Sequence, residues 1–129
     1  MTKPAIKITA TLGSLILLAG ALLQLGAVKY AKRAMANEPA NSFFQAEWVV
    51  LWILPFSHYI FIAALSVGLS RYKSKACAAV LMGFGALVLV DALILLTHIG
   101  LYIGTYMIAL AGALLLTCGV MLRKEARAG

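Results

Sequence analysis

The sequence predicts an all-α integral membrane protein, a four-helix transmembrane bundle formed by one domain of 129 residues. Hydrophobic residues make up 64% of the chain and charged residues only 12%, whereas average soluble domains are about 45–50% apolar and about 25% charged. The mean hydropathy is +0.99. In addition, the charged residues are spaced so that they leave four long apolar stretches. This composition excludes a soluble fold, a disordered chain and a disulfide-stabilised scaffold.

The first half of the chain contains two apolar stretches separated by a polar segment. A helix needs about 20 predominantly apolar residues to cross the hydrocarbon core. The first span, about residues 8–28, is longer than the apolar region of a signal peptide, so we expect a retained helix. The polar loop covers 29–47, and the second span covers about 48–70. Trp48 and Trp52 lie near the start of this span, where amphipathic rings anchor a helix at the membrane interface.

The second half of the chain is one apolar run that is long enough for two helices. We divide it at the segment Thr97-His98-Ile99-Gly100, which is polar and contains glycine, as turns do. The third span is then about 76–96, and the fourth is about 101–122. Gly100 and Gly104 form a G-x-x-x-G motif, which favours close helix packing in lipid and, more weakly, association between copies.

The net charge of +7 comes from basic residues at the ends of the spans, so it does not indicate a nucleic-acid partner. Three basic residues follow the first span, and eight lie on the other side of a four-span topology: Lys3, Lys7, Arg71, Lys73, Lys75, Arg123, Lys124 and Arg127. Basic residues concentrate on the cytoplasmic side. We therefore expect a plasma or inner membrane protein with both termini in the cytoplasm, where these charges face anionic lipid headgroups.

Four ionisable residues within the apolar stretches carry the functional signal, because charge inside a membrane is costly and usually faces the protein interior. Glu47 and His58 are separated by about three helical turns, and Asp91 and His98 by about two, so each pair shares a helix face. Counted from Lys73 in the short second turn, His58 and Asp91 differ in depth by about 5 Å. The same count gives about 1.5 Å for Glu47 and His98. The spacing predicts two acid–imidazole pairs between antiparallel helices.

No spacing in the chain indicates a metal or cofactor site. A haem held by both histidines would need them at similar depths, but His58 and His98 differ by about 15 Å. Cys77 and Cys118 form no C-x-x-C motif, and no three ligands follow zinc spacing. Phosphate loops, nucleophile elbows and H-E-x-x-H motifs are also missing from the sequence. We therefore expect no cofactor, no metal and no catalytic residues.

The leading functional hypothesis is a non-catalytic subunit or assembly component of a membrane complex, whose helices pack against copies of the chain or against a larger complex. It rests on the short loops, the lack of cofactor motifs and the small residues on the helix faces. Two alternatives remain open. One is a proton- or ion-coupled transporter that uses Asp91 and His58, with Glu47 and His98 at its entrance. The other is a small membrane enzyme that acts on a lipophilic substrate.

Overall fold

The computed structural model describes residues 2–36, 42–98 and 100–128 of the chain. Within these ranges the secondary structure is helical, and no strand occurs. The helices in chain order are α1 (Pro4–Ala36), α2 (Ser42–Leu69), α3 (Lys75–His98) and α4 (Ile103–Arg127).

Three of these helices are long and apolar enough to cross a membrane, and the described part of α2 adds a shorter apolar segment. The membrane-length segments are Pro4–Gly26, Lys75–Thr97 and Ile103–Arg127, and the shorter segment is Leu54–Leu69. Large aliphatic side chains such as Leu15, Leu93 and Leu110 point outward and are exposed, which suits a surface that faces lipid rather than water. The predicted all-α membrane bundle is thus confirmed.

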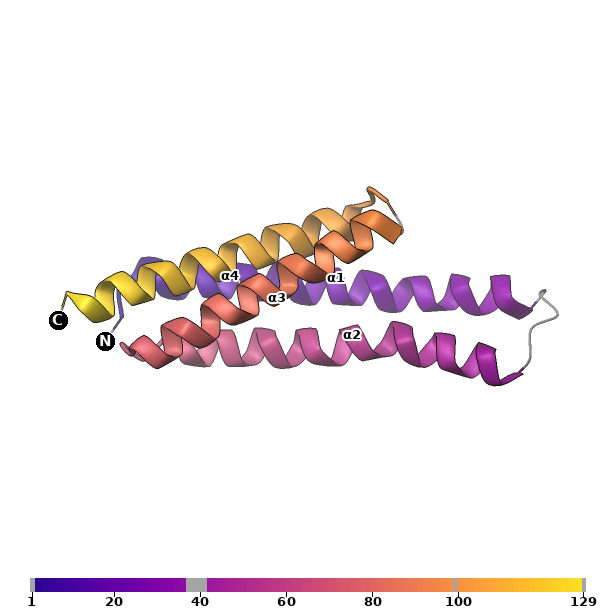
Figure 1. Ribbon diagram of the computed structural model, residues 1–129, viewed down its shortest axis with the longest axis horizontal. Coiled ribbons are helices and arrows are strands. Elements are labelled where there is room, and N and C mark those ends of the chain that lie inside the picture. The colour runs from indigo at the N-terminus through magenta and orange to yellow at the C-terminus, as the bar shows by residue number, and fades with distance from the viewer. Residues whose placement is uncertain (1, 37–41, 99, 129) are drawn as a thin grey trace.

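Three interfaces hold the four helices together. α2 packs on α1, α1 on α4 and α4 on α3, whereas α2 and α3 make few contacts with each other. Figure 1 shows both termini and the α2–α3 turn at one end of the bundle. At the opposite end, α1 and α2 extend beyond α3 and α4. At 1.5 Å per residue, α1 is about 50 Å long and α3 about 36 Å.

The polar loop that we predicted over 29–47 is much shorter in the structure. α1 continues to Ala36 and α2 begins at Ser42, so most of the predicted loop is helical. The segment after the first span is rich in alanine, lysine and arginine, which are strong helix formers in water. Charged residues therefore marked where the apolar part of the helix ends, and the helix itself continues past them.

Glycines allow α3 and α4 to approach each other closely. A methyl group added at Gly112 would lie 2.9 Å from Leu89 Cγ, and one added at Gly119 would lie 2.7 Å from the Met82 backbone nitrogen. On the facing helix, a methyl group added at Gly85 would overlap the backbone of Leu116. In lipid, where apolar burial does not favour one neighbour over another, such close backbone packing is a main source of helix association.

The two glycines of the G-x-x-x-G motif lie in different elements of the structure. Gly100 lies in the turn between α3 and α4 with a φ of 91°, and its N–H donates to the Leu95 carbonyl at 3.2 Å. Gly104 is the second residue of α4, and a methyl group added there would overlap the Tyr102 ring. Because the turn separates the two glycines, they form no packing face on a single helix.

The predicted turn also lies later in the chain than 97–100. α3 includes Thr97 and His98, and α4 starts at Ile103. The Thr97 hydroxyl donates to the Leu93 and Ile94 carbonyls at 3.1 and 3.0 Å. A threonine near a helix end can satisfy its hydroxyl within the helix in this way, so its polarity does not require a turn.

Gly100→Ala is expected to lower the free energy of unfolding by about 1–2 kcal/mol, because a side chain at positive φ meets the following carbonyl. Reversible unfolding in mixed micelles would measure the loss. Gly68→Ala is the matched control, since a methyl group added at Gly68 meets nothing within 4 Å. An equal loss for both variants would show that the turn does not depend on the backbone conformation of Gly100.

Two clusters of buried side chains form the core. The larger one lies at mid-bundle and includes Leu17, Tyr59, Val88, Ile108 and Leu115, and the smaller one, nearer the termini, includes Ile6, Leu81, Cys118 and Leu122. Side-chain hydroxyls add one hydrogen bond between α1 and α2 and another between Thr2, which precedes α1, and Ser70, which follows α2. Ser14 Oγ donates to the Ala63 carbonyl at 3.0 Å, and Thr2 Oγ1 donates to the Ser70 carbonyl at 2.7 Å. These bonds satisfy hydroxyls that would otherwise be buried without partners.

Candidate functional site

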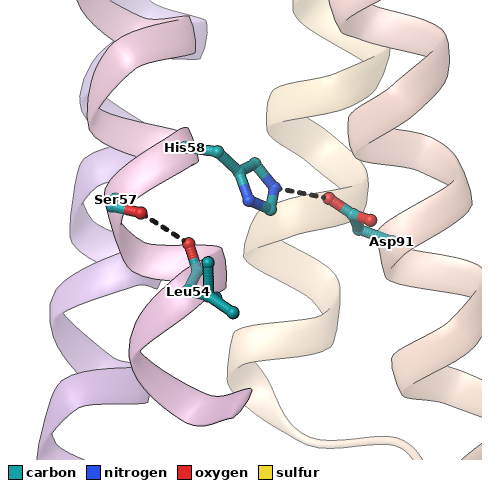
Figure 2. Close-up of polar contacts among 4 residues, drawn as sticks. All are labelled: Leu54, Ser57, His58 and Asp91. Atoms are coloured by element: carbon teal, nitrogen blue, oxygen red, sulfur yellow. Dashed lines mark hydrogen bonds and ion pairs between the residues drawn. The ribbon is translucent and has the colours of Figure 1, made fainter. Parts of the chain in front are cut away.

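The structure brings together one of the two predicted acid–imidazole pairs. His58 Nε2 on α2 lies 3.1 Å from Asp91 Oδ2 on α3, and the two side chains point toward each other across the space between these helices (Figure 2). A ring N–H at Nε2 donates to the carboxylate in this geometry. Among the side chains that the structure describes, this is the only ion pair. It joins α2 and α3, which make few other contacts with each other.

The pair lies partly on the surface of the bundle. The side chain of His58 is 41% exposed and that of Asp91 is 21% exposed. Apolar side chains on the same helix faces surround it. We call this surface the α2–α3 face, and it consists of the exposed or half-exposed residues Leu54, His58, Phe61, Leu65, Leu87, Asp91 and Ile94. An ionisable pair therefore lies in the middle of an apolar surface at membrane depth.

The turn of α2 that precedes His58 is shaped by Pro55. Proline lacks an N–H, so the Leu51 carbonyl loses its usual intrahelical donor. Ser57 does not replace that donor. Its Oγ donates instead to the Leu54 carbonyl at 2.8 Å, as Figure 2 shows. The hydroxyl of Ser57 is thus satisfied within α2, next to His58, and takes no part in the His58–Asp91 pair.

Tyr59 lies beside the His58–Asp91 pair, on the side that faces the interior of the bundle. Its side chain is buried, its ring meets the His58 ring edge-on with centroids 4.5 Å apart, and its hydroxyl interacts with Asp91. The carboxylate thus has an imidazole on its outer side and a phenol on its inner side. Tyr59 was not among the predicted site residues, although a mid-span tyrosine generally needs a polar partner.

A second polar group lies nearer the α3–α4 turn. Gln24 of α1 is buried, and Tyr102 interacts with both Gln24 and Thr105. Thr105 Oγ1 donates to the Gly100 carbonyl at 3.2 Å, which fixes the turn to the first turn of α4. The Gln24 Oε1 atom has no partner among the described residues. This group orders the start of α4 but does not reach the surface that carries the His58–Asp91 pair.

Several predicted site residues have side chains outside the part that the structure describes. Glu47, Trp48 and Trp52 belong to the helical backbone of α2, and His98 is the last residue of α3. Their side chains are not described, so the Glu47–His98 pair and the tryptophan anchors stay predictions. Among the described residues, no group of three or more His, Cys, Asp or Glu side chains is placed to hold a metal ion.

Comparison with known proteins adds no further constraint. No family model matches the chain, and neither curated proteins nor solved structures give a match.

Proposed function

We propose that this chain is a non-catalytic subunit of a membrane assembly that associates laterally through its α2–α3 face. The observation that carries the proposal is the His58–Asp91 pair, which is partly exposed on a surface that would otherwise face lipid. The basic residues at the end that holds the termini support placing that end in the cytoplasm of a plasma or inner membrane.

Placing a polar group in hydrocarbon costs free energy. Ionisable side chains within membrane spans almost always face a protein interior or a water-filled cavity. The pair is half-covered in the single chain, and Tyr59 covers only its inner side. A second protein surface placed on the α2–α3 face would remove the rest of the pair from lipid. Assembly would therefore remove the free-energy cost of exposing the His58–Asp91 pair to lipid.

A second copy of the chain fits this face best. Two-fold association brings the same surface of both copies together, so this surface must be complementary to itself. A residue of one copy meets a different residue of the other copy, and the reverse contact is also made. The α2–α3 face carries an acid and a base side by side. A two-fold axis near this pair would place His58 of each copy near Asp91 of the other. The surrounding apolar residues, such as Phe61 on α2 and Leu87 on α3, would then pack against each other.

Cysteine crosslinking would test this arrangement. In a Cys77→Ala background, Phe61→Cys is expected to give a disulfide-linked dimer, because Phe61 lies about one turn from His58 and close to the proposed axis. Leu110→Cys is the control, since Leu110 is similarly exposed but lies on α4. Denaturing electrophoresis after mild oxidation of intact membranes would measure the yield. Equal yields, or an adduct with a different protein only, would contradict self-association through this face.

One observation also favours a second candidate, a small transporter coupled to protons or ions. Asp91 pairs with His58 and interacts electrostatically with the interior Tyr59, and chains of such groups carry protons through pumps and transporters. This alternative uses the same residues in a different role. It requires the Asp91 carboxylate to change its protonation state, whereas the assembly proposal requires only that the pair be covered.

A further inference from the structure

The end of the bundle that holds both termini and the α2–α3 turn, here called the basic end, contains a hollow beside α1. Its volume is about 500 Å³, and it is lined by Lys7, Thr11, Val67, Ser70, Arg71 and Tyr72. Lys7 and Thr11 belong to α1, Val67 belongs to α2, and the other three follow α2 into the turn. Two segments that are far apart in the sequence therefore form its walls.

The charge of this hollow is not compensated by the residues that line it. Lys7 contributes one cation from α1 and Arg71 another from the turn, and no acid lines the hollow. Glu125, the acid of α4, lies instead in a second hollow with Lys3, Lys73 and Lys124, where its carboxylate accepts the Lys3 backbone N–H at 3.3 Å. Two cations on opposite walls, with no carboxylate among the described lining residues, produce a local positive potential that attracts an anion.

Below the hollow, both walls continue as lipid-facing apolar surface. Leu15 follows Lys7 and Thr11 at intervals of four residues, so it lies on the same face of α1. Ile60 is seven residues before Val67, about two turns, and shares its face of α2. Both Leu15 and Ile60 are exposed. The surface thus changes from cationic and hydroxylic at the end of the helices to aliphatic one to three turns further in.

A cationic surface at the end of the helices with an aliphatic surface below it matches an anionic phospholipid, which has a negative headgroup at the interface and acyl chains below it. A free phosphate ion would use the cations but not the aliphatic surface. Arginine suits the phosphate because its planar guanidinium offers paired donors, and lysine adds a point charge. Basic pockets between transmembrane helices at the membrane surface bind such headgroups. Tyr72, exposed at the same level, is of the residue type that concentrates at membrane interfaces.

We propose that this hollow is a specific site for the phosphate headgroup of an anionic phospholipid, which Lys7 and Arg71 hold from opposite walls. The lipid's acyl chains lie along α1 and α2 past Leu15 and Ile60. The inference does not rest on the proposed assembly through the α2–α3 face, because the two surfaces share no residue.

Lipid titrations of the purified full chain in detergent, followed by native mass spectrometry, would test this site. Phosphatidylglycerol is expected to bind at one molecule per chain more tightly than phosphatidylcholine. A basic residue near an anionic lipid contributes about 1 kcal/mol, so the variant Lys7→Gln/Arg71→Gln should bind phosphatidylglycerol about 25-fold more weakly. The charge-matched control, Lys73→Gln/Lys124→Gln, should stay within about twofold of the unmodified chain.

Two further arms make the result decisive. Lys7→Arg/Arg71→Lys keeps both charges and should restore most of the binding, which separates loss of the site from loss of the fold. Inorganic phosphate, added with phosphatidylcholine as the only lipid, should not bind measurably. The proposal is overturned if the control variant loses as much binding as the site variant, or if the site variant binds normally. It is equally overturned if phosphate binds through Lys7 and Arg71 while phosphatidylglycerol has no advantage.

Discussion

Gly85→Ala is expected to destabilise the bundle more than any other addition of a single methyl group to a described glycine. The new Cβ would lie 2.7 Å from Leu116 Cα and 2.8 Å from Leu116 Cβ, and closer still to the Leu116 backbone nitrogen. Backbone atoms cannot move aside as the end of a flexible side chain can, so α3 and α4 must separate. We expect a loss of about 3 kcal/mol in the free energy of unfolding, at the upper end for overpacked interiors. Reversible unfolding in mixed micelles would measure it.

Gly83→Ala is the matched control, two residues earlier on the same helix. A methyl group added at Gly83 meets nothing within 4 Å, so it adds no clash. Alanine restricts the unfolded chain more than glycine does, and we expect the free energy of unfolding to rise by about 0.5–1 kcal/mol. The two substitutions should therefore have opposite signs. Equal effects would mean that α3 and α4 are not held in close backbone contact.

The sequence did not indicate that Gly85 is one of the glycines at which two helices pack closely. The chain contains 11 glycines, and a G-x-x-x-G motif was the only local pattern available to choose among them. Close packing depends instead on the register of two helices. Gly85 faces Leu116, and Gly112 faces Leu89, so both contacts are set by where the α3–α4 turn lies. An uncertainty of a few residues in that turn was enough to hide which glycines touch the other helix.

The depth of the ionisable residues was easier to predict than their surroundings. The α2–α3 turn is short, so counting residues outward from Lys73 gives the depth of His58 and Asp91 with an error of about one helical turn. That count was sufficient to bring the two side chains within reach of each other. It carries no information on which helices pack side by side. The sparse α2–α3 contact, and therefore the exposure of the pair, follows from the way α1 and α4 pack together.

The basic hollow could not be predicted for a related reason. The sequence allowed the basic residues to be counted on each side of the membrane, which treats Lys7, Arg71 and Lys124 as equivalent. Their partners differ in the folded chain. Lys124 shares a hollow with Glu125, while Lys7 and Arg71 share one that contains no acid. Only the packing of α1 against the end of α2 makes this distinction.

Asp91→Leu is expected to weaken the bundle substantially, whereas Asp91→Asn should weaken it little. Leucine leaves the His58 ring nitrogen without its acceptor, and an unpaired polar group in a non-aqueous setting costs about 2 kcal/mol. Asparagine keeps an oxygen that accepts the hydrogen bond and removes only the charge. Unfolding in mixed micelles would measure stability, and the yield of the Phe61→Cys crosslink would measure association. If the two substitutions had equal effects on both, the hydrogen bond between α2 and α3 would have no structural role.

Proton flux in liposomes then separates assembly from transport, because Asp91→Asn preserves the hydrogen bond but cannot exchange a proton. A pH gradient is imposed across the vesicle membrane, and a pH-sensitive dye inside the vesicles reports proton entry. If the chain only assembles, the dye should respond equally slowly in vesicles with the unmodified chain, in vesicles with Asp91→Asn and in empty vesicles. Transport would instead give rapid flux that falls at least about 100-fold in Asp91→Asn, because a lost general acid–base step costs about 10²–10⁴-fold. Such a fall, in a variant that still crosslinks at Phe61→Cys, would assign the pair to proton movement and overturn a purely structural role for it.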